Sequence, residues 1–454
     1  MPKTQPIAQT TKQAYALVTP DEALPSGDPR YVPLDAARGT KNAAQSLAER
    51  ISALGSAVEQ GGRREFARFL VTGHSGCGKT TELNRLKDLL TRTNLAVVYF
   101  DAESEFDLQK QNVSWWNILL EVIWQIDTQL SEPPYRLQLP EGLRNAATEW
   151  LARTVTKKTQ RLDIESSLET EFGVDASLPF FAKAKAVFKA LIKAGSSTVR
   201  EIEQEAERRP NVLLEAVTDI VNHVDTALQK ERGRGLVIVV DGLEKIPLRS
   251  VGDGLTTHNL LFIHAGNYLK TPPCHMVYSL PLALLASANV GQVFPEQPVI
   301  MPMVRVRHRD GRPDAHGIRA LVEVIGRRVD SKLFAPGVLK RLALASGGHI
   351  RDFLRLVREA AAGFGKRVTT RDADRAVAQL VDTYNRLIEG RFIERLDYID
   401  QHQERLGGPE DGELINRLLV LEYRNDETWA ALHPCVKQSP RYVRSPRDRK
   451  EEKA

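Results

Sequence analysis

A glycine-rich loop at residues 73–80 limits what this chain of 454 residues can fold into. The loop reads Gly-His-Ser-Gly-Cys-Gly-Lys-Thr, which fits the pattern G-x-x-x-x-G-K-[ST], with an apolar segment before it and a helical pattern after it. Its glycines let successive backbone N–H groups turn toward one anion, and the following helix adds its positive end. The sequence therefore predicts a phosphate-binding loop between a strand and a helix.

The side chains of this loop have separate predicted tasks. We expect Lys79 to reach the outer phosphates and Thr80 to offer its hydroxyl to Mg²⁺. A helix N-terminus activates thiols, which would suit redox sensing by Cys77, but the favoured interpretation is a small residue that fits the loop. The remaining residues predicted to contact the nucleotide from this segment are Gly73, His74, Ser75, Gly76, Gly78 and Thr81.

A second apolar segment supplies the acidic half of the predicted site. Residues 236–240 are fully apolar, as expected of a strand covered on both faces, and they end at Asp241. We expect Asp241 to hold Mg²⁺ through its water shell. Glu244 is the candidate for positioning and deprotonating the attacking water. The alternative for Glu244 is a surface carboxylate paired with Lys245, because the more usual base position, directly after the aspartate, is occupied by Gly242.

Apolar segments alternate with helical patterns through the first three hundred residues, which predicts an α/β fold with a parallel sheet. The segment 95–100 is predicted to be a strand that sits between the phosphate-loop strand and the Asp241 strand. An additional strand is typical of nucleoside triphosphatases that activate water with a glutamate. No Asn-Lys-x-Asp motif for guanine recognition is present, so ATP is the expected nucleotide. The other predicted strands are 66–72, 276–280 and 299–304.

Composition divides the chain into further predicted units. The insertion is rich in Lys, Glu and Ala and is either a partner-docking element or a solvated helical hairpin. The C-terminal unit has a helix followed by a predicted hairpin, which is the outline of a winged helix. The units are a flexible arm (1–30), a P-loop core (31–304) with a helical insertion (131–234), an all-α lid (305–390), a winged-helix-like unit (391–436) and a basic disordered tail (437–454).

Charge is distributed unevenly along the chain. The net charge is +5, yet residues 305–372 hold sixteen basic and seven acidic residues and residues 437–454 hold seven and three, so the remainder sums to −8. This asymmetry suits DNA bound by the lid and tail, or else a solvated surface. Three cysteines indicate a reducing compartment, and we expect a cytoplasmic protein. No apolar run reaches the length of a membrane span, so no membrane association is expected.

These motifs resemble those of the AAA+ ATPases and the related STAND class, over roughly residues 30–390. The sequence Asp-Gly-Leu-Glu at 241–244 is similar to the acidic motif of NACHT-type STAND proteins. Residues 346–351, Ser-Gly-Gly-His-Ile-Arg, resemble the lid of origin-recognition and helicase-loading ATPases. That resemblance implies that Arg351 is the sensor 2 arginine, reaching the γ-phosphate from the lid. The alternative for Arg351 is a surface ion pair with Asp352.

The same resemblance extends to three other regions. Ser279, at the end of the fourth predicted strand, matches the polar sensor 1 position, with a strand-end cap as the alternative. Tyr31 and Val32 would pack on adenine, with Arg38 nearby. The chain also resembles uncharacterised bacterial ATPases with a Gly-His-x-Gly-Cys-Gly-Lys loop and a Leu-Glu-Tyr tail, here at 421–423.

One departure from the AAA+ pattern affects the expected function. Residues 251–303 hold no arginine, although ring-forming members place an arginine finger there. Either a displaced arginine serves, or the chain is a slow switch. We expect a slow ATPase switch that couples nucleotide state to a protein partner or to a nucleotide-dependent homo-oligomer. The alternatives are a DNA-associated ATPase, such as a loader or transposition regulator, and a nucleotide-dependent scaffold that controls a defence effector.

Overall fold

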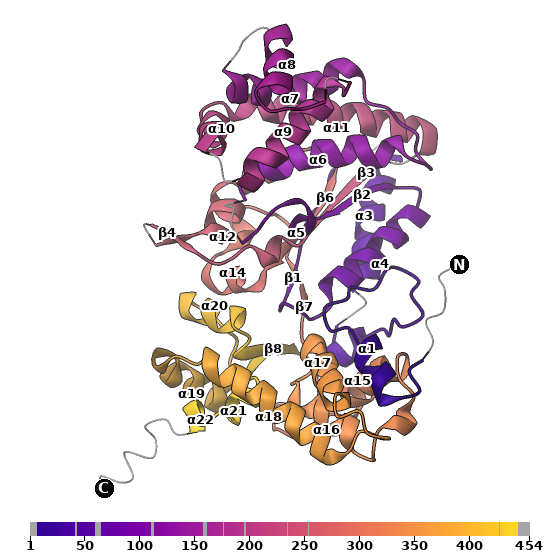
Figure 1. The fold of residues 1–454 in the computed structure, drawn as a ribbon, viewed down its shortest axis with the longest axis vertical. Helices are drawn as coiled ribbons and strands as arrows, with labels where there is room; N and C mark the ends of the chain where they lie inside the picture. Colours follow the sequence, from indigo (N-terminus) through magenta and orange to yellow (C-terminus); the bar gives the residue numbers. More distant parts are fainter. Residues whose placement is uncertain are drawn as a thin grey trace.

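The computed structural model describes residues 7–40, 43–59, 65–109, 113–157, 161–175, 177–194, 197–233, 235–252, 254–425 and 427–443. Figure 1 shows three parts along the long axis: a helical cap, a central sheet with its flanking helices, and a second helical body that contains the C-terminal hairpin. Within the described ranges, no helix is long and apolar enough to cross a bilayer.

The central sheet is parallel and has five strands in the order β2-β3-β6-β1-β7. Every residue of β1, β3 and β6 is buried, as helices on both faces require. The bounds are β1 (Arg68–Gly73), β2 (Ala96–Asp101), β3 (Leu236–Asp241), β6 (His275–Pro281) and β7 (Val299–Met301). The predicted α/β fold with a parallel-sheet P-loop core is confirmed.

The strand that separates the phosphate-loop strand from the Asp241 strand comes from later in the chain than expected. It is β6, which pairs with both β1 and β3, whereas β2, the segment predicted at 95–100, lies at the sheet edge beside β3. Order along the chain does not fix order in a sheet, because each parallel connection is long enough to cross over several strands. The ends of β1 and β3 therefore lie on either side of β6.

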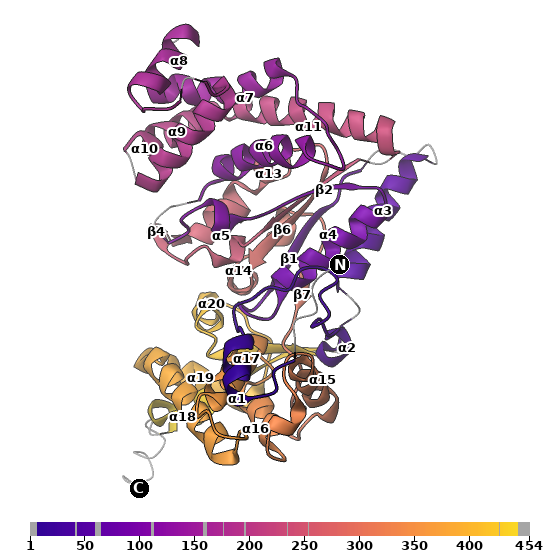
Figure 2. The same ribbon diagram turned by 45° about the vertical axis from the view of Figure 1, so that its right-hand side comes forward.

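Two sets of helices cover the two faces of the sheet (Figure 2). Helices α3 (Ala43–Glu59) and α4 (Lys79–Arg92) cover one face, and α6 (Trp115–Ser131) and α11 (Pro210–Arg232) lie on the other. Residues of β3 alternate between the two cores: Val237 and Val239 pack with α3 and α4, and Ile238 and Val240 pack with α6 and α11. Shorter elements of the core are α2 (Asp35–Arg38), α5 (Ala102–Glu105), β4 (Ser250–Gly252), β5 (Leu255–Thr256), α12 (Thr257–Asn259), α13 (Gly266–Leu269) and α14 (Leu282–Ser287).

The helical insertion forms the cap above α6 (Figure 1). Its helices are α7 (Glu141–Thr156), α8 (Arg161–Thr170), α9 (Phe180–Ala194) and α10 (Ser197–Arg208). Phe188 of α9 lies with its ring centroid 5.7 Å from that of Trp116 and 5.2 Å from that of Trp124, and all three side chains are buried. The cap therefore shares one apolar core with the sheet.

The lid is helical, as predicted, and has a core of its own. It comprises α15 (Ala315–Gly326), α16 (Val338–Ala345), α17 (Ile350–Ala361) and α18 (Thr370–Leu387). Helix α1 (Thr11–Leu17) packs against α17, and Ala8 forms a β-bridge with Val329. The prediction of a loosely held arm is wrong for residues 7–30, because apolar side chains such as Ala14 and Val18 are buried against the lid. Residues 1–6 lie outside the described part of the chain.

The C-terminal unit has the predicted helix and hairpin, but the hairpin does not project into solvent. Leu421, Tyr423 and Trp429 are buried in the same apolar cluster as strand β1. The elements are α19 (Ile393–His402), α20 (Pro409–Asn416), β8 (Val420–Arg424), β9 (Thr428–Leu432), α21 (Pro434–Lys437) and α22 (Pro440–Val443). The hairpin therefore packs between the sheet and the lid.

The start of the predicted disordered tail is folded. Residues 437–443 are folded, because Tyr442 is buried and its hydroxyl lies 3.3 Å from Asp400 Oδ2. Lys437 forms an ion pair with the same aspartate. The rest of the predicted tail, residues 444–454, lies outside the described residues.

Candidate functional site

The phosphate loop turns at the carboxyl edge of the sheet, between the end of β1 at Gly73 and the start of α4 at Lys79. Gly76 has a φ of +80°, and a Cβ added there would lie 2.7 Å from His349 Nε2 and 2.8 Å from Arg351 Cβ. Gly78 has a φ of +99° and caps α4. Both positions need glycine, because L side chains rarely adopt this backbone conformation and the lid leaves no room at Gly76.

The Lys79 ammonium lies inside the loop. Its Nζ is 3.0 Å from the Gly73 carbonyl oxygen, 3.1 Å from the His74 carbonyl oxygen and 3.1 Å from Glu244 Oε1. Burial alone would lower the pKa of Lys79, but the charge of Glu244 outweighs it and raises that pKa. Lys79 therefore keeps its positive charge inside the loop.

Asp241 ends β3 beside the loop, in contact with Thr80. The Thr80 hydroxyl hydrogen-bonds to the Asp241 carboxylate, the Tyr99 hydroxyl donates to Asp241 Oδ2 at 2.9 Å, and the Gly242 amide donates to Oδ1 at 2.7 Å. Burial and the nearby charge of Glu244 raise the pKa of Asp241 to about 6. A buried carboxylate next to a hydroxyl is an oxygen donor set that fits Mg²⁺, and a dication would offset the crowded negative charge.

Glu244 lies in a 3₁₀ turn (Leu243–Lys245) directly after β3. Ser279, at the end of β6, holds this turn, since its Oγ accepts from the Leu243 amide at 2.9 Å and its hydroxyl hydrogen-bonds to Glu244. The Glu244 side chain is only 8% exposed. Burial would raise the pKa of Glu244, but Lys79 and then the Ser279 hydroxyl outweigh it and hold the pKa below its usual value. Glu244 is thus ionised and directed at Lys79.

The alternative interpretation of Glu244 as a surface carboxylate paired with Lys245 does not describe its position. Lys245 Nζ lies instead 3.2 Å from Asp101 Oδ2 and 2.6 Å from Glu103 Oε2. A side chain at Gly242 has no space, because a Cβ there would lie 2.0 Å from Asp101 Oδ1. The position directly after Asp241 therefore cannot easily carry a carboxylate, and the carboxylate that lies beside Lys79 belongs to Glu244.

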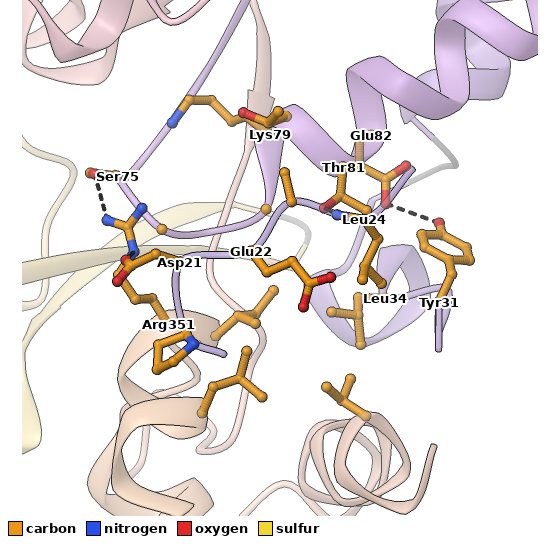
Figure 3. A pocket seen from close by; sticks show the side chains of 18 of the residues that line it. Asp21, Glu22, Leu24, Tyr31, Leu34, Ser75, Lys79, Thr81, Glu82 and Arg351 are labelled. Carbon is orange, nitrogen blue, oxygen red and sulfur yellow. Dashed lines mark hydrogen bonds and ion pairs between the residues drawn. The ribbon is translucent and has the colours of Figure 1, made fainter. Parts of the chain in front are cut away.

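Arg351 extends from the start of α17 toward the loop (Figure 3). Its Nη1 donates to Ser75 Oγ at 3.1 Å, and its Nε lies 2.8 Å from Asp21 Oδ1. Its partners are therefore on the loop and the N-terminal segment, and the alternative, an ion pair with Asp352, is absent among the described contacts. This position suits the sensor 2 role, which stays a prediction.

The pocket continues from the loop into a compartment between α4, the N-terminal segment and the lid, whose lining mixes apolar and charged side chains (Figure 3). Tyr31 and Val32, the residues that the resemblance assigns to adenine, line it. The Tyr31 hydroxyl donates to Glu82 Oε1 at 2.9 Å and accepts from Arg85 Nη1 at 2.9 Å, which fixes the ring. The other apolar lining side chains are Leu24, Leu34, Val324, Ile350 and Leu354.

The N-terminal residues 20–24 also line the pocket, and sequence reasoning missed them. The Leu24 amide donates to Thr81 Oγ1 at 3.2 Å, and Asn84 Nδ2 donates to the Leu24 carbonyl at 3.0 Å. The only available signal was the apolar Leu24 within a polar, turn-rich stretch. Thr81 therefore lines the pocket while its hydroxyl anchors this segment to α4.

Three of the loop residues predicted to contact nucleotide lie behind the pocket. Gly73, His74 and Cys77 are absent from its lining, whereas Ser75, Gly76, Gly78, Lys79, Thr80 and Thr81 form part of it. Cys77 is buried in the core beneath the loop, and the Arg38 guanidinium donates to its carbonyl. The His74 Nε2 accepts from the Glu422 amide of β8 at 2.9 Å. Burial and the positive charge of His349 lower the pKa of His74 to about 3, so the ring is neutral.

No protein-family model and no curated protein sequence matches the chain. Among solved structures it is similar to a Walker-type ATPase of Pyrococcus abyssi, with 12% identity and a TM-score of 0.42 over 93% of this chain and 99% of that one. The Orc1 protein of Aeropyrum pernix in complex with DNA shares 15% identity over 93% and 95%, with a TM-score of 0.38. Cdc6p from Pyrobaculum aerophilum shares 12% identity over 96% and 98%, with a TM-score of 0.36. These likenesses are distant, and the site rests on the chain's own geometry.

Proposed function

We propose that the chain binds ATP with Mg²⁺ and hydrolyses it slowly, as an AAA+/STAND-like switch. One observation carries the proposal: Lys79, Thr80, Asp241 and Glu244 converge at the carboxyl ends of β1 and β3, where the phosphate loop turns. A cationic lysine, a hydroxyl beside a carboxylate and a second, ionised carboxylate are the groups that triphosphate hydrolysis needs. The compartment beside Tyr31 offers apolar side chains against which a base could pack.

Each residue then has a chemical task. Lys79 neutralises the outer phosphates, and in doing so it exchanges the carbonyl oxygens of Gly73 and His74 for phosphate oxygens. Thr80 and Asp241 would hold Mg²⁺, which neutralises charge on the triphosphate when bound. Glu244, held by Ser279, accepts the proton of the attacking water. Ser279 touches Glu244 and acts as its positioning residue.

Nucleotide binding is tested by the thermal stability of the full chain. At a concentration of about 100 times its Kd, a ligand that binds only the folded state stabilises it by about 2.7 kcal/mol. We therefore expect ATP with Mg²⁺ to raise the Tm by a few degrees, and EDTA or replacement of ATP by GTP to reduce that shift. Differential scanning fluorimetry measures this. A Tm that ATP and Mg²⁺ leave unchanged would contradict the proposal.

Arg351→Ala tests the switch. Because Arg351 contacts the loop from the lid, we expect the variant to keep most of its ATP affinity but to lose the nucleotide-induced compaction of lid and core. Small-angle scattering with and without a nonhydrolysable ATP analogue measures the change. Arg375→Ala is the matched control, because Arg375 lies on α18 of the lid and pairs with Asp372 rather than with the loop. Compaction equal to wild type in Arg351→Ala would rule out the sensor role.

A second candidate is a DNA-associated ATPase, which the surface of the lid favours. Seven exposed basic side chains of the lid form no ion pair with another described residue: Arg307, Arg319, Lys332, Lys340, Lys366, Arg367 and Arg371. The buried hairpin argues against a winged-helix mode of groove insertion, since its strands are covered by the core. Binding to a nonspecific DNA duplex at several salt concentrations distinguishes a DNA-binding lid from a lid whose charges are only solvated. A DNA-binding lid should lose affinity steeply as the salt concentration rises, because several phosphate contacts are involved. A solvated lid should not bind the duplex.

A further inference from the structure

A buried series of polar contacts runs from the phosphate loop through the lid to the C-terminal unit. The Nε2 of His349 lies 2.6 Å from the Ser75 carbonyl oxygen, and its Nδ1 lies 3.1 Å from Asp352 Oδ2. The Nε2 of His433, which caps α21, lies 3.4 Å from the same Asp352 oxygen. The three side chains are at most 2% exposed. One carboxylate thus joins three parts of the chain that are distant in sequence.

Both rings face Asp352. His349 Nε2 lies against a carbonyl oxygen and its Nδ1 against the Asp352 carboxylate. His433 Nδ1 accepts from the Cys435 amide at 3.1 Å, which leaves its Nε2 to face the same carboxylate. Burial would raise the pKa of Asp352, but the charge of His349 and the hydrogen bonds from both histidines hold that pKa well below its usual range. His349 and Asp352 therefore form a buried ion pair.

The carboxylate is fixed from two further directions. The Tyr384 hydroxyl of α18 donates to Asp352 Oδ2 at 2.6 Å, and Arg355 Nη1 donates to Oδ1 at 3.1 Å. The rings of Tyr384 and His433 stack with their centroids 4.1 Å apart. Removing one member of a buried ion pair is costly, because the other charge is left unpaired. We therefore expect His349 and Asp352 to move together.

The phosphate loop packs closely against His349. At Gly76 a single added Cβ would already lie 2.7 Å from His349 Nε2, and the Arg351 amide donates to the Gly76 carbonyl at 3.3 Å. On the other side, His74 accepts from the Glu422 amide of β8. A displacement of the peptide between Ser75 and Gly76 therefore displaces His349 and, through Asp352, His433.

We propose that His349, Asp352 and His433 are positioning residues that hold the Ser75–Gly76 peptide of the phosphate loop and carry its displacement on nucleotide binding to the hairpin and α21. This role rests on the nucleotide binding proposed above. It is separate from that of Arg351, which lines the pocket, because His349, Asp352 and His433 are not part of the pocket lining and contact the loop from behind.

Hydrogen exchange on the full chain tests the proposal with Asp352→Asn. Without nucleotide, we expect exchange in residues 70–82 to be roughly tenfold faster than in wild type, as the loss of a charge-assisted hydrogen bond predicts. With a nonhydrolysable ATP analogue and Mg²⁺, we expect the change that wild type shows in residues 420–437 to be lost. Arg375→Gln is the matched control, because the exposed Arg375 guanidinium pairs with Asp372 at the start of α18 and is not among the contacts of the loop or of the three residues; its exchange in both regions should equal that of wild type.

Two outcomes overturn the proposal: unchanged loop exchange in Asp352→Asn, or a hairpin response equal to wild type in that variant. Should Asp352→Asn fail to fold, His433→Gln decides, because it leaves the ion pair intact and should lose the hairpin response while the loop stays protected. A wild type that does not bind the ATP analogue contradicts the proposed function, and the nucleotide-free comparison of the loop still tests positioning. A wild type that binds it with no change in residues 420–437 refutes the coupling alone.

Discussion

Glu244→Gln is expected to bind ATP about as well as wild type and to hydrolyse it at least ~100-fold more slowly, within the range that general-base assistance contributes. Glutamine keeps the size of the side chain and a hydrogen bond to Ser279, but it cannot take the proton of the attacking water. Phosphate release under saturating ATP measures the rate, and calorimetry measures affinity. Equal turnover in variant and wild type would show that another carboxylate is the base.

Two neighbouring carboxylates supply the controls for this variant. Glu103→Gln removes an exposed carboxylate that pairs with Lys245 near the same pocket, and it should leave hydrolysis unchanged. Asp241→Asn should weaken Mg²⁺-dependent ATP binding as well as turnover. The Asp241 carboxylate hydrogen-bonds to the Thr80 hydroxyl, and these two groups would hold the Mg²⁺ ion together. No ATPase activity above background in the wild type, with candidate partners and DNA present, would mean that hydrolysis is not the function.

Lys79→Ala should weaken ATP binding by roughly 10- to 100-fold, which corresponds to the loss of one hydrogen bond to a charged group. The lysine is buried and its Nζ has three partners that a triphosphate would replace or share. Titration with a fluorescent ATP analogue measures the affinity. Wild-type affinity in this variant would remove the basis for a phosphate loop at residues 73–80.

The Lys79 variant needs a stability control, because Glu244 would remain buried without its cation. The Tm of each variant therefore accompanies the titration. Lys245→Ala is the matched substitution: this lysine lines the same pocket but pairs with Asp101 and Glu103 outside the phosphate loop. Its ATP affinity should stay close to that of wild type, so that a loss in Lys79→Ala alone reports the phosphate contact.

Features set by neighbouring residues could be predicted from the sequence. The loop, the buried strand that ends at Asp241 and the lid helices all follow from short-range spacing, and the hairpin at Val420–Leu432 follows from two apolar runs around a turn. Contacts between distant segments could not be predicted. His74 has the same local pattern whether it faces a nucleotide or, as here, the Glu422 amide 348 residues away.

The same limit applies to the unit behind the loop and to the N-terminal segment. Asp352 looks like an exposed partner for its neighbour Arg351, but α17 turns it inward to two histidines and a tyrosine. Helix α1 is short and polar, and only the lid surface gives its few apolar residues a place to pack. Helical periodicity identifies a buried face but not the segment that covers it.

The contact between β8 and the phosphate loop also limits when the loop can be completed during synthesis of the protein. The ribosome adds about 5–20 residues per second, so the 348 residues between His74 and Glu422 take roughly 20 to 70 s to make. During that interval the nascent loop lacks its hairpin partner, and for most of it the loop lacks His349 as well. If the proposed function holds, the nucleotide site of a chain still being translated is therefore unfinished until the last strands have emerged.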